Sequence, residues 1–493
     1  MKKQFRGFPN SILRVVSVLV GFSVSLWAGT RQPGYPVPHV GGPTFPQSVA
    51  PGGPDFTLTV YGANFIPAST VNWNRQPRAT TFVSAHELQA TILASDIAVP
   101  TAGMITVTTT SPKGPITSST YFQVEVHDAR STMGSTTEVT YTNLGAFYNF
   151  AADFTNNNAV GPVGIMGGTG TSDILGTLIN NGKGVFHLGA PITKKGYPYA
   201  AVYSNALGDF NGDGNLDFLY LIGRNNQSTP THLAISFGNG NGTFTPGPVF
   251  GSFGPIGPGV PDVVVGDFNQ DGVLDVAALE GGNRNTEMFL GIGDGTFVTG
   301  RPFYSDQCGN FIAGDFNGDG KLDLLCAAYE QGALNFDFRI LFGNGDGTFQ
   351  PSQQIAKSPT QPFFTPTFFV NDFNNDGSLD IAFSAPNGQL GILLNNGDGT
   401  YQAPTYYSLG NQNPFTFALG DFNNDGKTDV IIMESFPPAL EVMLGNGDGT
   451  FQSPQMLSMP PITSLAFTVA DFNNDGLLDF AFPDGGFYPC FQQ

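Results

Sequence analysis

The chain contains little charge and few cysteines. Charged residues make up 12% of its 493 residues, and lysine and arginine together number only 19. Long solvated helices draw on Glu, Lys and Arg, so this shortage excludes a coiled coil or a helical bundle. A formal charge of −20 leaves no basic stripe for phosphates, which excludes a nucleic-acid-binding protein. Three cysteines are too few for a disulfide-stapled scaffold.

Long apolar runs are missing beyond the N-terminus. The run Val15–Trp27 follows four basic residues and is shorter than the roughly 20 residues that cross a bilayer. It predicts a secretory signal peptide over residues 1–28, with an uncleaved N-terminal anchor as the alternative. No later stretch is apolar enough to span a membrane. The protein is therefore expected to be secreted or held at the cell surface, with a periplasmic location left open.

Glycine (65), proline (37) and phenylalanine (45) are abundant. Glycine and proline favour short strands joined by tight turns. So many phenylalanines can bury enough surface to exclude a disordered chain. Cys308 and Cys326 flank one predicted hairpin but stand about two residues out of register, so a disulfide between them is left open.

The first folded unit is predicted at residues 43–127, after a Pro- and Gly-rich linker at residues 29–42. Phe56, Leu58 and Val60 alternate with threonines, which is the period of a half-buried strand. Similar short runs recur about every ten residues up to Val126, a spacing that favours a small β-sandwich.

Three motifs in this unit resemble those of IPT/TIG immunoglobulin-like domains. They are GANF at Gly62–Phe65, VNWN at Val71–Asn74 and TTFVS at Thr80–Ser84, the last followed by Glu87-Leu88. The resemblance implies a spacer or binding module without catalytic residues, and no acid–base cluster stands in this stretch.

From about residue 130 to residue 493, the chain repeats itself. The pattern Asp-Phe-Asn-x-Asp-Gly-x-x-Asp occurs six times, at separations of 48 to 58 residues. The copies begin at Asp209, Asp267, Asp315, Asp372, Asp421 and Asp471. A degenerate seventh copy begins at Asp153 and lacks the acidic residues at positions 5 and 9, so no ion is expected there.

A second glycine-rich motif, typified by Gly-Asn-Gly-Asp-Gly-Thr-Phe, stands in each repeat. About 50 residues with two such turns leave room for four short strands, and Asp-Gly suits a tight hairpin. We therefore predict an all-β chain, in which a small immunoglobulin-like sandwich precedes a seven-bladed β-propeller. A linear solenoid is the main alternative.

Ring closure is expected to involve the start of the repeat region. Only 14 residues follow Asp479, which suffices for strands two and three of the last blade but hardly for a fourth. Residues 136–142 (TTEVTYT) are predicted to supply that fourth strand. The alternative is an open, truncated last blade.

The repeated aspartates predict a metal site. Three carboxylates that converge within a few ångströms repel one another unless a cation neutralises them. A hard divalent cation with six or seven oxygen ligands suits this pattern, and calcium tolerates irregular geometry better than magnesium. Glycine at position 6 allows the sharp turn, and position 7 would offer its main-chain carbonyl. The alternative is six polar turns that simply face water.

These loops resemble the FG-GAP/VCBS repeats of integrin α-subunit propellers and of secreted bacterial proteins. The resemblance implies about six structural Ca²⁺ sites, each bound through positions 1, 3, 5, 7 (carbonyl) and 9. Transferred to this sequence, the ligands are Asp209, Asn211, Asp213, Asn215 and Asp217; Asp267, Asn269, Asp271, Val273 and Asp275; Asp315, Asn317, Asp319, Lys321 and Asp323; Asp372, Asn374, Asp376, Ser378 and Asp380; Asp421, Asn423, Asp425, Lys427 and Asp429; and Asp471, Asn473, Asp475, Leu477 and Asp479.

Catalytic motifs are not evident. None of the five histidines stands beside a repeating acidic partner in the sequence, and no nucleophile elbow or zinc-binding helix motif occurs. We expect a secreted, non-enzymatic binding or adhesion protein with an extracellular glycan or protein partner. The alternatives are a propeller lyase or hydrolase acting on polysaccharide, and a structural component of the cell envelope.

Overall fold

The computed structural model describes residues 35–118, 120–130, 136–138, 141–142, 147–166, 174–189, 205–222, 230–253, 263–279, 285–304, 308–329, 336–357, 367–385, 388–409, 414–435, 438–457, 467–483 and 486–492. The predicted signal peptide lies outside them. In this part of the chain no helix is long and apolar enough to cross a membrane.

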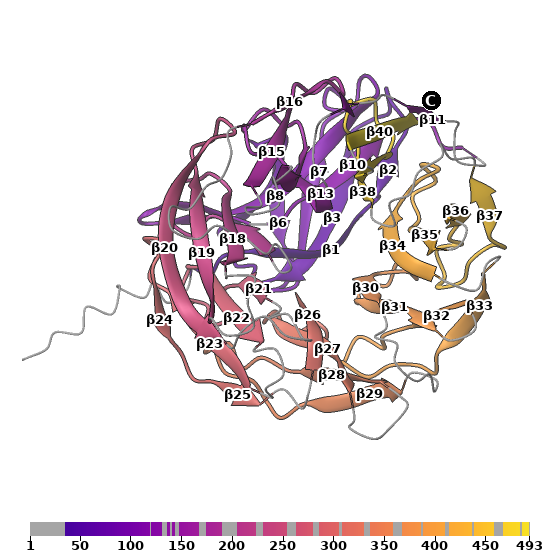
Figure 1. Cartoon of the computed structure of the whole chain (residues 1–493). Helices are drawn as coiled ribbons and strands as arrows, with labels where there is room; N and C mark the ends of the chain where they lie inside the picture. The colour runs from indigo at the N-terminus through magenta and orange to yellow at the C-terminus, as the bar shows by residue number, and fades with distance from the viewer. Residues whose placement is uncertain are drawn as a thin grey trace, which may run out of the picture.

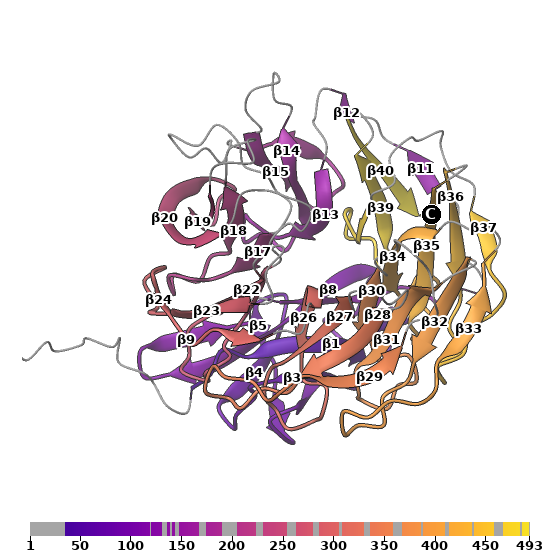
Figure 2. The same ribbon diagram turned by 60° about the horizontal axis from the view of Figure 1, so that its bottom comes forward.

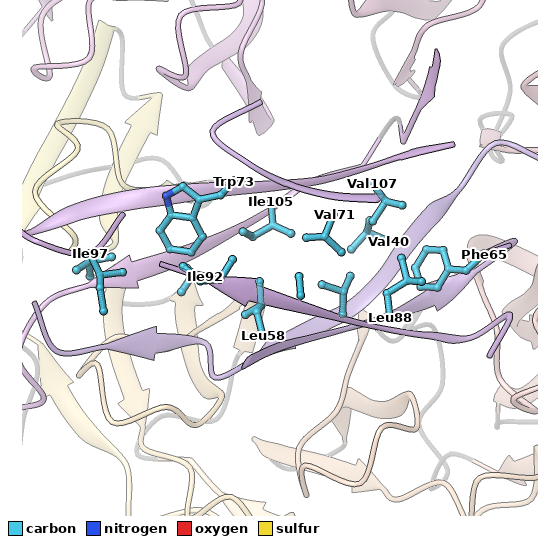
Figure 3. Packing of buried hydrophobic residues seen from close by; sticks show 14 residues of the cluster. Val40, Leu58, Phe65, Val71, Trp73, Leu88, Ile92, Ile97, Ile105 and Val107 are labelled. Carbon is cyan, nitrogen blue, oxygen red and sulfur yellow. The ribbon is translucent and has the colours of Figure 1, made fainter. Parts of the chain in front are cut away.

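The N-terminal unit is a sandwich of two sheets, ordered β1-β3-β7-β6 and β2-β10-β8-β4-β5, with β9 paired to β8. Its strands are β1 (His39–Phe45), β2 (Ser48–Val49), β3 (Phe56–Ala63), β4 (Ser69–Trp73), β5 (Gln76–Pro77), β6 (Thr80–Phe82), β7 (Glu87–Ile92), β8 (Thr101–Ser111), β9 (Gly114–Thr117) and β10 (Phe122–Val126). Leu58, Trp73 and Ile105 meet between the sheets (Figure 3). The period-2 pattern therefore predicted the buried faces correctly.

The boundary of the sandwich differs from the prediction. Strand β1 begins at His39, inside the segment predicted to be a linker, and pairs with β3. The reason is that Val40 is fully buried in the sandwich core, so a stretch that is rich in Pro and Gly still contributes a strand.

Seven further antiparallel sheets follow in the described residues. Five have four strands in chain order, and two have a fifth short strand, β25 (Phe303–Tyr304) or β12 (Tyr141–Thr142). The first six comprise β13 (Phe147–Ala152), β14 (Gly161–Met166), β15 (Ile174–Asn180) and β16 (Phe186–Leu188); β17 (Asn205–Gly208), β18 (Asp217–Ile222), β19 (Thr231–Gly238) and β20 (Phe244–Phe253); β21 (Val263–Gly266), β22 (Asp275–Leu279), β23 (Asn285–Gly291) and β24 (Phe297–Thr299), with β25 (Phe303–Tyr304) also on β23; β26 (Cys308–Gly314), β27 (Asp323–Tyr329), β28 (Phe336–Leu341) and β29 (Gln353–Lys357); β30 (Phe368–Asn371), β31 (Asp380–Ala385), β32 (Gln389–Leu393) and β33 (Thr405–Ser408); and β34 (Pro414–Gly420), β35 (Asp429–Ser435), β36 (Pro438–Met443) and β37 (Gln455–Leu457). Figure 1 shows these sheets following one another around a ring, which confirms the propeller.

The seventh blade is closed by the segment that precedes the first. Its own strands are β38 (Thr468–Ala470), β39 (Asp479–Pro483) and β40 (Gly486–Gln492). Strands β11 (Thr136–Glu138) and β12 (Tyr141–Thr142) pair antiparallel with β40. The predicted closing strand is thus confirmed, and the alternative of an open last blade is not.

The hydrophobic core of the ring lies between blades. Seven clusters of buried residues each combine side chains from two neighbouring blades, and one of the seven joins the last blade to the first. In that closing cluster, Phe186 and Val160 of the first blade lie with Phe472 and Ala481 of the last. Each blade therefore depends on both neighbours to bury its faces.

The two repeated motifs meet at these interfaces. Phe472, at position 2 of its loop, packs edge-to-face on Phe186, the aromatic residue that ends the second motif in the next blade, with ring centroids 5.7 Å apart. The Phe472 carbonyl also accepts a hydrogen bond from the main-chain amide of Gly184. Equivalent ring pairs join Phe154 to Phe244, Phe210 to Phe297, Phe268 to Phe349 and Phe373 to Phe451.

Cys308 and Cys326 form a disulfide between β26 and β27, with a Cα–Cα distance of 5.5 Å. Cys308 pairs in register with Ala328, so the two cysteines do stand out of register as the sequence indicated. The register shifts between Gly309 and Phe311, and this irregularity accompanies the approach of the two cysteines.

Replacing Phe472 by alanine should lower the free energy of unfolding by about 3–5 kcal/mol, because a fully buried ring is lost. A double-mutant cycle with Phe186→Ala should show about 0.5–1.5 kcal/mol of coupling, measured by denaturant unfolding. Val298→Ala, at a half-exposed side chain, is the control and should change stability by less than about 0.5 kcal/mol. Strict additivity of the two phenylalanine variants would contradict the pairing.

Candidate functional site

Each intact aspartate loop, the nine-residue segment between strands one and two of a blade, is folded around its own carboxylates. In the first loop, Oδ1 of Asp209 accepts hydrogen bonds from the amides of Gly212 and Asp213, and Oδ2 accepts one from the amide of Gly214. Oδ1 of Asp213 accepts the Asn215 amide proton at 2.8 Å. Side-chain turns of this kind start at positions 1, 3 and 5 of the loop.

Two positions of the loop need a left-handed backbone. Glycine at position 6 has φ between 78° and 89° in all six copies. Position 4 also has positive φ, including Gln270 and Asn375 at 58° and 60°. Gly, Asn and Gln are the only residues at position 4 in the intact copies. This explains a restriction that the sequence alone did not reveal.

Position 9 is an anchor inside the protein. Asp217 is fully buried. Its Oδ2 accepts a hydrogen bond from the Phe210 amide and its Oδ1 accepts one from the Gly238 amide, each with an N···O distance of 2.9 Å. The carboxylate thereby ties the start of the loop to the end of strand three. Both bonds recur at the other five position-9 residues, Asp275, Asp323, Asp380, Asp429 and Asp479. The sequence predicted a ligand here and did not predict this structural role.

Burial makes these carboxylates costly to ionise. Burial, with repulsion from the other carboxylates of the loop, raises the pKa of Asp217 to about 7 and the pKa values of Asp323, Asp380 and Asp429 to about 8. An acid whose folded pKa is raised binds protons more tightly when folded. The ion-free ring therefore loses stability as pH rises from the unfolded value near 4 toward these folded values.

The loops fit a hard dication in the chemistry of their donors. Positions 1, 3 and 5 offer carboxylate and amide oxygens, and those that accept a single hydrogen bond, such as Oδ2 of Asp209, keep a second lone pair. Within the described residues, no three acidic, histidine or cysteine side chains are gathered closely enough to ligate one ion. The chemistry thus suits calcium at positions 1, 3, 5 and 7, and the ligand role of position 9 stays a prediction.

The sandwich lies across the face of the ring that carries these loops, hereafter the loop face (Figures 1 and 2). The main-chain amide of Val37 donates to Asp267 at 2.8 Å, and Nδ1 of His86 lies 2.9 Å from Oδ2 of Asp315. The Ser48 hydroxyl donates to Asp421. Three position-1 carboxylates, in three different blades, are thus bound by one domain.

The degenerate loop carries a cation from the protein itself. Asp153 is buried, and the guanidinium of Arg75 in the sandwich lies 3.0 Å from its Oδ2. Main-chain amides of Asn157 and Asn158 also donate to this carboxylate. An arginine therefore supplies positive charge where the loop has lost its other acidic residues.

The Asp209 loop is the least covered by the sandwich. Asp209 itself is half-buried, whereas the other five position-1 aspartates are buried. Cavities of about 430 and 200 Å³ lie between this loop and the sandwich. An ion in this loop would exchange most easily with solvent.

The position-6 glycines also let the sandwich approach. A Cβ at Gly320 would lie 2.3 Å from the Cβ of Ala85, and one at Gly476 would lie 2.5 Å from the Val126 carbonyl oxygen. Gly214 and Gly426 face open space. Glycine at this position therefore allows the turn in every loop, and in some loops it also allows the close contact with the sandwich.

Four alanine variants separate these two roles. All four glycines have φ near 80°, so each substitution should cost about 1–2 kcal/mol in backbone strain. Gly320→Ala and Gly476→Ala should also loosen the sandwich and speed amide hydrogen exchange in it, whereas Gly214→Ala and Gly426→Ala should not. Equal exchange in the sandwich of all four variants would rule out the docking role.

Comparison with known proteins agrees with the repeat geometry. The model of the FG-GAP-like repeat matches residues 209–278, 315–383, 372–432 and 421–482. The C-terminal region carries FG-GAP-like repeats. The matches include all six intact aspartate loops and leave out the Asp153 copy and the sandwich. No curated protein matches the chain.

Solved structures resemble the chain only distantly. A lectin from Agrocybe aegerita that recognises non-reducing terminal N-acetylglucosamine is 16% identical, over 86% of this chain and 98% of the lectin, with a TM-score of 0.46. The rhamnogalacturonan lyase YesW is 11% identical, over 93% and 91%, with a TM-score of 0.42. An auxiliary nutrient binding protein from Bacteroides ovatus is 12% identical, over 93% and 98%, with a TM-score of 0.34. Such similarity carries no argument about function.

Sequence reasoning missed the contacts of the sandwich with the loops. His86 and Arg75 were not singled out for any role toward the repeats, yet each lies on a position-1 aspartate. No local signal could have revealed them, because the partners are 229 and 78 residues apart in the chain.

Proposed function

We propose that this chain is a secreted, calcium-stabilised and non-enzymatic binding protein, which presents one propeller face to an extracellular glycan or protein. The observation that carries the proposal is the burial of acidic side chains in all six FG-GAP-like loops, with oxygen donors around them. A dication in each loop would offset their repulsion. The Cys308–Cys326 disulfide supports an oxidising, extracytoplasmic location.

The magnitude of the stabilisation fits a structural ion. Extracellular calcium modules have dissociation constants of about 0.1–1 mM. At roughly 1 mM calcium, six such sites would add about 2–8 kcal/mol, against a typical domain stability of about 5–15 kcal/mol. The ions would decide whether the ring survives outside the cell.

The partner is assigned to the face opposite the loop face. The sandwich covers the loop face, and antiparallel strands place the loops between strands two and three, and those between blades, on the other face. The partner loops expected there are Gly223–Thr231, Gly251–Pro261, Glu330–Asp337 and Pro359–Thr367. Most of their residues lie outside the described part of the chain, so no contact residue is assigned.

Calcium removal tests the metal part of the proposal. EGTA should lower the melting temperature by on the order of 10 °C. Asp213→Ala, at position 5 of the least covered loop, should bind one Ca²⁺ fewer by elemental analysis after dialysis against dilute calcium. Asp294→Ala is the matched control, because Asp294 also accepts a main-chain proton from two residues on and is exposed, but belongs to the second motif. A melting temperature indifferent to chelator would overturn the metal role.

A glycan array probed with and without EGTA tests the binding role. Saturable binding that leaves the glycan intact and falls with EGTA is the expected result, because the ring that shapes the face would lose its ions. Shortening of a polysaccharide by the purified protein would establish the enzyme alternative instead. Co-fractionation with the cell envelope and no soluble ligand would favour the structural role.

A further inference from the structure

A cavity of about 530 Å³ lies on the propeller axis, where the sandwich closes the loop face. Inner strands of several blades form its walls, with Leu207, Val265, Leu419 and Val469 among the apolar side chains. The sandwich closes it with the segment that ends in β10. Its volume is in the range of sites for small organic ligands.

Two buried carboxyl groups line this cavity, those of Glu125 and Asp421. Strand β10 directs Val124 and Val126 into the sandwich core, so the alternate residues Gln123 and Glu125 face the ring. Both line the cavity, and Glu125 is 2% exposed. No other residue of the described structure donates a hydrogen bond or an ion pair to the Glu125 carboxyl group; its own main-chain amide is the one donor near it.

Several other polar groups of the cavity are already engaged. The Gln123 side-chain oxygen accepts the Asp471 amide proton, the Gln47 amide group donates to Thr428, and the Tyr121 hydroxyl donates to the Ala151 carbonyl. Asp421 accepts the Ser48 hydroxyl proton. Glu125 thus stands out as a buried acid that receives a hydrogen bond only from its own main-chain amide, an arrangement that proteins rarely keep without a use.

The local electrostatics favour a positive ligand. Burial, and repulsion from Asp421 and Asp471, raise the pKa of Glu125 well above its usual value. No Lys, Arg or His is among the residues that line the cavity in the described structure. A cation paired to Glu125 would therefore meet no competing basic side chain among these residues.

We propose that the axial cavity binds a small organic cation, an amine on an apolar body, with the ammonium group paired to Glu125 and the body against the inner strands. The apolar walls argue against a bare metal ion, which would require several oxygen ligands at once. They argue equally against a sugar, whose hydroxyl groups would find few free partners. This site is distinct from the proposed partner face, and it borders one proposed calcium loop at Asp421.

Tryptamine and its neutral counterpart tryptophol are suitable probes, because they differ mainly in the charged group. By calorimetry on the full chain with calcium present, tryptamine should bind at least about tenfold more tightly than tryptophol, as expected for one charge-assisted contact. In Glu125→Gln this difference should vanish, while the affinity for tryptophol stays the same. Glu87→Gln, on the other sheet of the sandwich, is the matched control and should behave as the wild type.

Two further measurements keep the test decisive. Val265→Trp should fill the cavity and weaken both probes, which places them there. Glu125→Gln should melt at the same temperature as the wild type or higher, because a buried acid without a partner is removed. Lower melting of that variant, equal affinities of the two probes, unchanged binding in Val265→Trp, or no binding of tryptamine below about 1 mM would each overturn the proposal.

Discussion

Buried carboxylates that accept main-chain hydrogen bonds hold each intact blade together at the loop face. Position 9 of every intact loop binds the amide at the start of the loop and another at the end of strand three. Two elements that are not adjacent in sequence are thereby fixed to one side chain. The same charge that stabilises these contacts is costly to bury, so the architecture needs compensating positive charge. Arg75 and the sandwich amides supply part of it, and the proposed dications would supply more.

The ring adds a second requirement, because its core lies at the joints between blades. Phe at position 2 and the aromatic residue of the second motif meet across these joints, and Phe472 with Phe186 closes the circle in the same way as the interior joints. The two motifs, which read as separate turns in the sequence, are two halves of one contact. Loss of either aromatic residue would expose the core between that blade and its neighbour.

Much of the fold could be predicted because it is local or periodic. The strand pattern around Leu58, the four strands of each repeat and the closing role of residues 136–142 all follow from spacing and turn chemistry. The contacts of His86 with Asp315 and of Arg75 with Asp153 could not be predicted, because they depend on how two domains meet. The start of β1 at His39 was missed because proline and glycine masked a strand that Val40 anchors in the core.

The docking of the sandwich has a consequence for how such a repeat chain can change over time. Free repeat arrays gain and lose units readily, because every unit meets only its neighbours. Here the blades meet the sandwich through different groups: an amide from Val37, an imidazole from His86, a guanidinium from Arg75. Inserting or deleting one blade would shift every later loop out of step with its own contact. The sandwich therefore constrains the number and order of the blades, because each aspartate loop has to match the sandwich group that it contacts.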